Sequence, residues 1–244
     1  MVAHRGASAE APENTLEAFE RALRAGADAV EVDVRMTLDG TAIVMHDPDV
    51  ARTTDGSGNV CALTLEEIKS LRIAGRQEVP TLAEALAAVS GRAGIDVEIK
   101  NIPGEPDFDP EGQPGVDALV AALDEVGFTG PVLVSSFNPL ALSRVRTVAP
   151  GLERGLLGGP DAEAWAALAF AEREGHGWVL PFVARVQDAG DGYAAAVHRA
   201  GLRLGTWIVD DPDEALTLMR AGCDAVATND PARIVAARRR LFET

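Results

Sequence analysis

The segment TLEAFERALRAGADAVEVDV, residues 15–34, contains the structural unit from which the fold of this chain can be predicted. Apolar residues recur with helical spacing over Thr15–Arg24, Gly26 follows, and Ala29–Val34 is a short run rich in valine. Helical periodicity, a glycine and then a β-branched run are typical of an α-helix that leads into a buried β-strand. The segment therefore predicts one helix–strand unit of an α/β protein.

The same alternation continues along almost the whole chain. The expected strands are Met1–His4, Ala29–Val34, Ile95–Ile99, Val132–Ser135, Arg154–Leu157, Trp178–Pro181, Leu202–Ile208 and Ala225–Thr228. The helical patterns are Thr15–Arg24, which we expect Asn14 to cap, Leu82–Val89, Val116–Val126, Leu140–Val148, Ala162–Arg173 with Asp161 before it, Tyr193–Ala200, Glu214–Ala221 and Ala232–Leu241. Eightfold alternation in 244 residues predicts a single (β/α)8 TIM barrel that spans residues 1–244.

One further strand-like run, Ala42–His46, interrupts the alternation. Only Arg35–Thr41 separates it from the preceding strand, whereas a parallel crossover needs about a dozen residues or more. An Asp-Gly pair between the two apolar runs is a turn signal. We therefore expect an antiparallel β-hairpin that brings His46 near Glu31 or Asp33.

The stretch from residue 47 to residue 80 is polar and contains one short helical pattern, Leu65–Leu71. It follows the end of a strand, and loops at this end of a TIM barrel carry the functional site. We expect it to form a small insertion over the barrel mouth.

Composition excludes several classes of partner. The formal net charge of −16 is unfavourable for binding nucleic acid or an anionic membrane, both of which attract basic surfaces. We find no apolar run as long as a membrane span and no leader-like start. Cys61 and Cys223 are far apart and lack metal-ligand spacing, so reduced thiols are the expectation, although a disulfide is possible. We therefore expect a cytoplasmic protein.

Acidic side chains are expected inside the barrel. Residues two apart on a strand share a face, so Glu31 and Asp33 point the same way, as do Glu98 and Lys100. Barrel interiors are normally filled with branched apolar side chains, and burying unpaired carboxylates costs several kcal/mol each. A divalent cation removes this cost, and ligands that offer only oxygen favour Mg²⁺ or Ca²⁺. A solvated strand end or a structural ion pair is the alternative for either pair taken alone.

Two histidines stand at strand ends. His4 ends the first strand and precedes Arg5, and His46 ends the hairpin. Histidine titrates near neutral pH, so two such residues can serve as general base and general acid. By contrast, His176 lies in a loop and His198 lies late in a helix, which is the pattern of structural or exposed histidines.

These residues occur in motifs that resemble the glycerophosphodiester phosphodiesterase family. The motifs are HRGASAEAPENT at His4–Thr15, AVEVDVRMTLDGTAIVMHD at Ala29–Asp47, ARTTDGSG at Ala51–Gly58, VPTLAEAL at Val79–Leu86, VEIK at Val97–Lys100, SSF at Ser135–Phe137 and TWIV at Thr206–Val209. The resemblance runs nearly end to end in the expected order, and the combination of motifs is far more specific than any one of them.

The resemblance implies a role for each matching residue. His4 and His46 match the acid–base pair, Glu31, Asp33 and Glu98 match the metal ligands, Arg5 and Lys100 match the residues that hold the phosphate, and Phe137 and Trp207 match aromatic positions at the glycerol end of the site. One departure lies before the last helix. Thr228-Asn229-Asp230-Pro231 stands where members often have Thr-Asp before the final helix, which leaves any role of Asn229 or Asp230 open.

The implied reaction is hydrolysis of a small glycerophosphodiester to sn-glycerol 3-phosphate and an alcohol. The nucleophile is either a neighbouring glycerol hydroxyl, which gives a cyclic phosphate, or water, and either histidine can act first as base. Alternatives are a lysophospholipase D-like or phospholipase C-like enzyme, which needs an apolar rim that residues 47–80 do not offer, and a non-catalytic phosphodiester-binding barrel. A metal-dependent amidohydrolase would need His-x-His in the first strand, which is absent.

Overall fold

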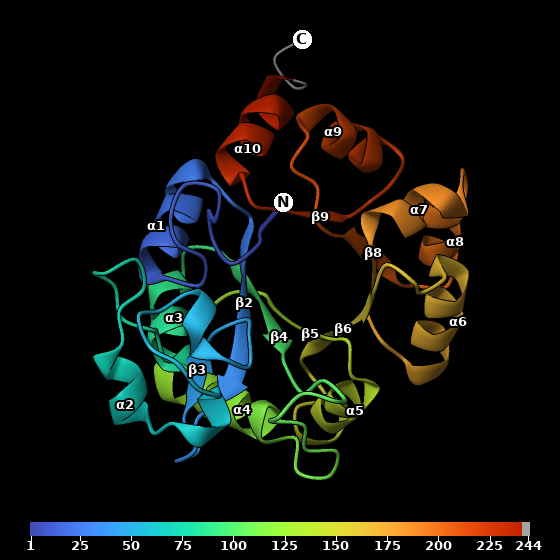
Figure 1. Cartoon of the computed structure of the whole chain (residues 1–244). Coiled ribbons are helices and arrows are strands. Elements are labelled where there is room, and N and C mark those ends of the chain that lie inside the picture. The colour runs from blue at the N-terminus through green and yellow to red at the C-terminus, as the bar shows by residue number, and fades with distance from the viewer. Residues whose placement is uncertain (241–244) are drawn as a thin grey trace.

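The computed structural model describes residues 1–240 and has the expected closed (β/α)8 barrel (Figure 1). Its strands are β1 Val2–Ala3, β2 Ala29–Met36, β3 Ala42–Val44, β4 Gly94–Ile99, β5 Val132–Ser136, β6 Glu153–Gly158, β7 Trp178–Pro181, β8 Arg203–Thr206 and β9 Ala225–Thr228. All of them except β3 pair in parallel, and pairing of β1 with both β2 and β9 closes the barrel. The eight strands expected from the sequence are thus confirmed.

The helices form the outer ring of the barrel, apart from α2, which belongs to the insertion after β3 (Figure 1). They are α1 Leu16–Ala25, α2 Leu65–Ser70, α3 Leu82–Val89, α4 Pro114–Val126, α5 Pro139–Val148, α6 Ala164–Glu174, α7 Val183–Ala189, α8 Tyr193–Arg199, α9 Pro212–Arg220 and α10 Pro231–Arg240. The expected last helix also included Leu241, which lies outside the described residues. Within residues 1–240 no helix is long and apolar enough to cross a membrane.

Valine-rich strands direct alternate side chains to the two sides of the barrel wall. Val30, Val32 and Val97 are fully buried between the strands and the surrounding helices. Their neighbours in the chain, at positions 31, 33 and 98, point to the barrel interior instead. Alternation along β2 and β4 therefore packs the core and supplies the polar interior at the same time.

The hairpin after β2 forms as expected. Val34 pairs with Val44 in an antiparallel ladder, and the Met45 N–H donates to the Asp33 carbonyl at 2.9 Å. This register carries the chain back along β2, so His46 returns to the strand that holds the interior carboxylates.

The insertion at residues 47–80 lies along one side of the barrel mouth and contains α2 and two short 3-10 helices, Val50–Arg52 and Val60–Ala62 (Figure 1). Its apolar side chains are buried in a small separate core formed by Ile43, Met45, Val50, Val60, Ile68, Ile73 and Val79. Because the apolar residues of this segment pack against one another, they do not form an apolar rim at the barrel mouth.

Three local expectations were wrong. Thr15, not Asn14, caps α1, and its hydroxyl accepts from the Ala18 N–H. Glu163 rather than Asp161 precedes α6 as its cap residue. Helix α7, which is short, was not expected. Asn14 instead takes a positive φ of 57°, which frees its side chain to face the barrel interior.

Gly6 connects β1 to the loop before α1 at a point of close approach. Its φ is +81°, and a Cβ there would lie 2.6 Å from the Ala18 carbonyl carbon. Gly6→Ala is therefore expected to lower the free energy of unfolding by about 2–5 kcal/mol through strain and overlap. Chemical denaturation measures this change. Gly40→Ala is the matched control, because Gly40 has φ +79° and nothing within 4 Å, so only the backbone strain applies. Equal losses in the two variants would contradict a role for the close contact.

Candidate active site

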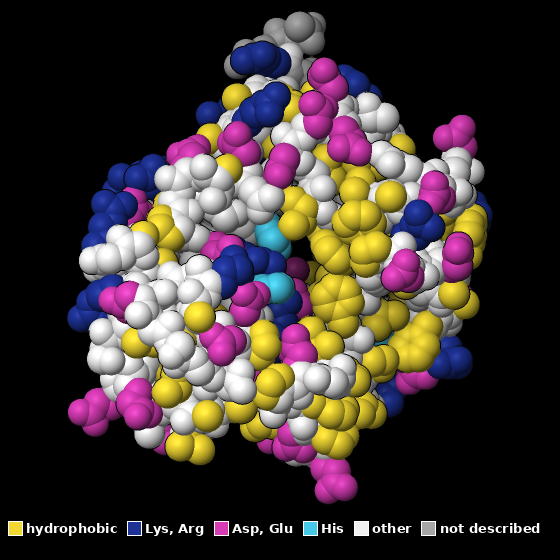
Figure 2. All heavy atoms as spheres, in the orientation of Figure 1, with side chains coloured by type: hydrophobic (Ala, Val, Ile, Leu, Met, Phe, Trp, Pro, Cys, Tyr) yellow, Lys and Arg dark blue, Asp and Glu magenta, His cyan; other side chains and the backbone are white. Residues whose placement is uncertain are grey.

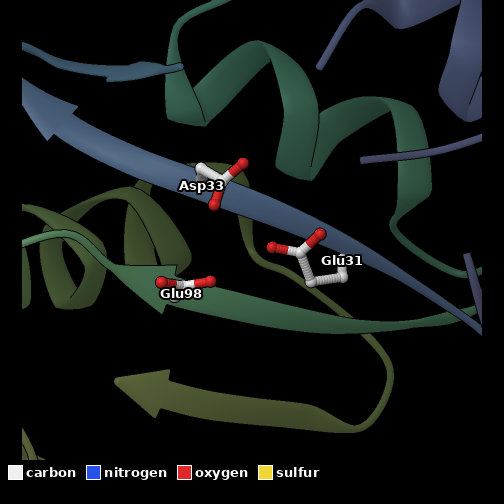
Figure 3. A group of neighbouring side chains, drawn as sticks. All are labelled: Glu31, Asp33 and Glu98. Carbon is white, nitrogen blue, oxygen red and sulfur yellow. The ribbon is translucent and has the colours of Figure 1, made fainter. Parts of the chain in front are cut away.

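Three carboxylates meet inside the barrel near its mouth (Figure 3). Glu31 and Asp33 project from β2, and Glu98 projects from β4, where it pairs in register with Asp33. One oxygen from each carboxylate lies within 4.8 Å of the others, and the residues are only 5%, 0% and 7% exposed. The three carboxylates therefore lie on the interior face of the barrel, as strand alternation predicted.

The pKa values of these three buried carboxyl groups shift in opposite directions, because their charged neighbours differ. Burial, followed by the charges of Asp33 and Glu98, raises the pKa of Glu31 well above its usual range. Burial also raises the pKa of Glu98 to about 7. Burial alone would raise the pKa of Asp33 too, but the charges of Lys100 and Arg5 hold it well below its usual range. In this cluster the charged forms of Glu31 and Glu98 are thus disfavoured, while Asp33 is held in its charged form.

The donor set fits a hard divalent cation. Every donor is a carboxylate oxygen, and the Glu31 Oε1 atom is buried without a hydrogen-bond partner among the described residues. An orphaned buried acceptor beside two other carboxylates is unfavourable unless a ligand satisfies it. Glu31, Asp33 and Glu98 could therefore hold a metal ion.

Two basic side chains flank the carboxylates. The Arg5 Nε atom lies 3.0 Å from Asp33 Oδ2, and its Nη1 donates to Glu13 at 2.9 Å. The Lys100 Nζ atom lies 3.0 Å from Asp33 Oδ1 and also pairs with Glu98. Both basic side chains therefore border the carboxylate cluster and line the same cavity.

Further contacts orient Asp33 and Glu31. The Asn14 Nδ2 group donates to Asp33 Oδ2 at 2.7 Å, and the Arg5 backbone N–H donates to Glu31 Oε2 at 2.8 Å. The contribution of Asn14 was missed, because an asparagine before a helix reads from sequence as a cap.

His4 and His46 both line the cavity at the barrel mouth. His4 Nδ1 contacts Asn229 Oδ1 at 2.8 Å, and burial, followed by the charge of Arg5, lowers the pKa of His4 to about 4. His46 Nδ1 contacts the Asp47 carboxylate at 2.6 Å, and burial lowers the pKa of His46. The two rings therefore have different partners, one a neutral amide and the other a carboxylate.

A buried ion cluster holds the backbone beside His46. The Arg35 Nε group donates to the His46 carbonyl at 2.7 Å, while its Nη atoms pair with Asp107 at 2.7 Å and Glu105 at 2.9 Å. The Arg35 side chain is almost fully buried. The alternation along β2 is enough to predict that Arg35 shares a face with Glu31 and Asp33. It does not predict the acidic partners of Arg35, because they lie about seventy residues away in the chain.

The cavity has a volume of about 210 Å³ and two unlike halves. The charged half carries the histidines, the acids and the bases. The other half is apolar and is lined by Phe137 and Trp207, whose rings lie edge to face with their centroids 5.5 Å apart. The Phe182 ring is not part of this lining but contacts the same indole, with a centroid distance of 5.2 Å. Figure 2 shows histidine side chains at the opening, with basic side chains on one side and hydrophobic side chains on the other. The aromatic residues of this apolar wall come from the loops after β5 and β8, and Phe182, from the loop after β7, contacts Trp207.

The remaining histidines lie elsewhere. His198 pairs with Asp224 at 2.9 Å, and His176 borders a separate small cavity between α5 and α6. Neither lines the cavity at the mouth, which agrees with their expected structural or exposed character.

Fold and site together define a barrel hydrolase of the phosphodiesterase class, with an acidic centre that could hold a metal ion. Comparison with known proteins agrees. The Glycerophosphoryl diester phosphodiesterase family matches residues 4–233. The chain belongs to this family.

Individual relatives match over nearly the whole chain. A glycerophosphodiester phosphodiesterase of Caldanaerobacter subterraneus is 34% identical over 96% of both chains. A solved Oleispira antarctica phosphodiesterase, in complex with the product sn-glycerol-3-phosphate, is 29% identical with a TM-score of 0.85 and covers 98% of this chain and 96% of its own. A solved glycerophosphodiester phosphodiesterase of Agrobacterium tumefaciens is 27% identical with a TM-score of 0.78, covering 96% and 98%.

Proposed function

We propose that this enzyme hydrolyses small glycerophosphodiesters, such as glycerophosphocholine, glycerophosphoethanolamine and glycerophosphoglycerol, to sn-glycerol 3-phosphate and an alcohol. The observation that carries the proposal is that two histidines, two basic side chains and three buried carboxylates line or border one cavity. Family membership and the product bound to the Oleispira antarctica relative support the choice of a glycerol-linked phosphate.

The basic side chains would bind the substrate phosphate. A phosphodiester carries one negative charge, and negative charge grows on its non-bridging oxygens during attack. Arg5 and Lys100 would neutralise this charge, since both border the carboxylate cluster where the phosphate would lie. Phe137 and Trp207 would pack against the carbon atoms of the glycerol.

His4 and His46 would move the protons. One ring would take a proton from the attacking hydroxyl, and the other would protonate the departing alcohol oxygen. Glu31, Asp33 and Glu98 would hold the cation, either Mg²⁺ or Ca²⁺, which when bound supplies positive charge to the phosphate and lowers the pKa of a hydroxyl ligand. Attack by a glycerol hydroxyl and attack by water both fit these groups.

The apolar wall favours a second candidate, a phosphodiesterase of the lysophospholipase D or phospholipase C type that acts on lipid substrates. Phe137 and Trp207, together with Leu133 and Leu180, offer apolar surface beside the charged half of the cavity. The sequence showed no such rim because the wall is assembled from separate segments of the chain. A purely phosphodiester-binding barrel is disfavoured, since both histidines and all three acids are present.

A substrate panel distinguishes these functions. We expect kcat/KM for the hydrolysis of glycerophosphocholine, measured as release of glycerol 3-phosphate, to exceed kcat/KM for the hydrolysis of monomeric lysophosphatidylcholine. Trp207→Ala should lower kcat/KM for both substrates, while Trp165→Ala, an exposed indole on α6 that does not line the cavity, should leave both unchanged. Higher kcat/KM for the lysolipid would favour the second candidate, and tight binding of glycerophosphocholine without turnover would favour the binding barrel. A cytoplasmic location and the absence of a nucleic-acid partner stay predictions.

A further inference from the structure

The amide of Asn229 is the partner of one catalytic candidate. Asn229 follows β9, and its Oδ1 atom lies 2.8 Å from His4 Nδ1. The Ser8 hydroxyl donates to the same oxygen at 2.9 Å, and the Ala9 backbone N–H donates to the Asn229 carbonyl at 3.0 Å. Closure of the barrel between β1 and β9 makes these contacts possible, because Ala3 pairs with Thr228.

Asp210 determines which way this amide points. Asn229 Nδ2 donates to Asp210 Oδ2 at 2.8 Å, and the Asn229 backbone N–H donates to Asp210 Oδ1 at 2.7 Å. Burial would raise the pKa of Asp210, but these hydrogen bonds lower it, so this carboxyl group is ionised and can only accept. The NH₂ group of Asn229 must therefore face Asp210, and its oxygen must face His4.

This orientation specifies the tautomer of His4. An amide oxygen can only accept, so the His4 Nδ1 atom must carry a proton to form the contact. In the neutral ring, Nε2 is then the nitrogen that keeps a lone pair. In neutral His4, Nε2 is therefore the ring nitrogen that can accept a proton.

We infer that Asn229 is a positioning residue for His4, and that Asp210 orients it. The chain Asp210–Asn229–His4 holds the imidazole as the Nδ1–H tautomer without placing a carboxylate against the ring. His46, by contrast, contacts the carboxylate of Asp47 directly. The inference rests on the proposed role of His4 in proton transfer, and it gives the neutral residue at position 229 a function.

Other charges around His4 do not replace this contact. Arg5, Asp33 and Lys100 act on the ring by charge, and Asp210 interacts with it both by charge and through the intervening amide. Charge alone does not choose between ring nitrogens, whereas a hydrogen bond to one nitrogen does. The tautomer is therefore the property that isolates the contribution of Asn229.

The first test is ¹H–¹⁵N spectroscopy of the histidine rings in the full chain, with His4→Gln used to identify the His4 signals. We expect neutral His4 to show the Nδ1–H pattern in the parent protein. Asn229→Leu, which removes the acceptor at similar size, should abolish this preference. It should also lower kcat by about 10–100-fold, the usual cost of losing a partner that orients a functional histidine, with little change in KM.

A charge swap separates positioning from folding. In the double variant Asp210→Asn with Asn229→Asp, the amide at position 210 would donate to the carboxylate at position 229. An oxygen of that carboxylate would still face His4 Nδ1. We expect the Nδ1–H tautomer to persist and the pKa of His4 to rise by about 1 unit or more, since an adjacent anion favours the charged ring. Asn229→Asp alone should be less active than the swap, because two carboxylates then face each other.

His198→Gln is the matched control, since that ring pairs with Asp224 away from the cavity, and it should leave kcat unchanged. An Nε2–H tautomer in the parent protein, or unchanged His4 signals in Asn229→Leu, would overturn the inference. So would a charge swap that does not raise the His4 pKa. The spectra need no substrate, so failure of the proposed function would appear separately, as absent turnover with the tautomer intact.

Discussion

Replacing either His4 or His46 with glutamine is expected to lower kcat for glycerophosphocholine hydrolysis by about 10²–10⁴-fold, with a much smaller effect on KM. Glutamine keeps the approximate size and polarity of the side chain but does not exchange protons near neutral pH. The charged groups that would bind the phosphate, Arg5 and Lys100, remain in place, so binding should survive while proton transfer fails. Steady-state release of glycerol 3-phosphate measures both constants.

Two comparisons sharpen this prediction. His176→Gln alters a histidine that does not line the cavity, and it should retain the parent kcat. The double variant His4→Gln with His46→Gln should lose less than the product of the single losses, since groups that act as a unit are non-additive. Full turnover in either single variant would contradict the acid–base assignment of that residue.

Removing divalent cations with EDTA is expected to abolish turnover and to lower the melting temperature of the parent protein, because three buried carboxylates then face one another. Added Mg²⁺ or Ca²⁺ should restore both, with a stabilisation that grows with concentration as for any ligand of the folded state. Comparing the two ions by this stabilisation identifies the preferred one. Full activity in EDTA would overturn the metal assignment.

Glu31→Gln provides a test that does not depend on activity. The folded-state pKa of Glu31 is raised well above 4.5 and that of Glu98 to about 7, chiefly by burial. A carboxyl group with a raised pKa stabilises the fold most at low pH, and this stability is lost as pH rises from about 4.5 through the folded-state pKa. Without metal, the parent protein should therefore lose stability as pH rises to 7 and above.

Glu31→Gln removes one of these buried charges. In EDTA at neutral pH, we expect it to melt several degrees above the parent, roughly the shift that 1 kcal/mol produces in a domain of this size. The same variant should gain little from Mg²⁺ or Ca²⁺. The exposed acid Glu66 on α2 gives the control, and Glu66→Gln should respond to cations as the parent does. A metal response in Glu31→Gln equal to that of the parent would contradict its role as a ligand.

Much of the site was predictable because it depends on strand alternation. Glu31 and Asp33 share a face by their spacing alone, and the Asp-Gly turn returns His46 to the same strand. Both inferences use contacts between residues close in the chain. The parallel register of β2 with β4, which places Glu98 opposite Asp33, follows from adjacent strands of one barrel.

Groups that depend on distant contacts were not predictable. Arg35 reaches Asp107 across 72 residues, and the acids of the loop at residues 101–115 give no local sign of which basic side chain they pair with. Phe137 and Trp207 were indicated by the family resemblance alone, whereas their contact with each other and with Phe182 joins three separate loops and has no local signal.

The sequence by itself determined the barrel, the hairpin and the identity of the acidic face, because hydrophobic periodicity and turn chemistry act over a few residues. Tertiary structure alone decided the hydrogen-bond partner of the His4 ring. Asn229 meets His4 across 225 residues only because β1 and β9 pair to close the barrel. Such a contact leaves no local pattern in the chain, since hydrogen-bond partners are selected by distance in space and not by spacing in sequence.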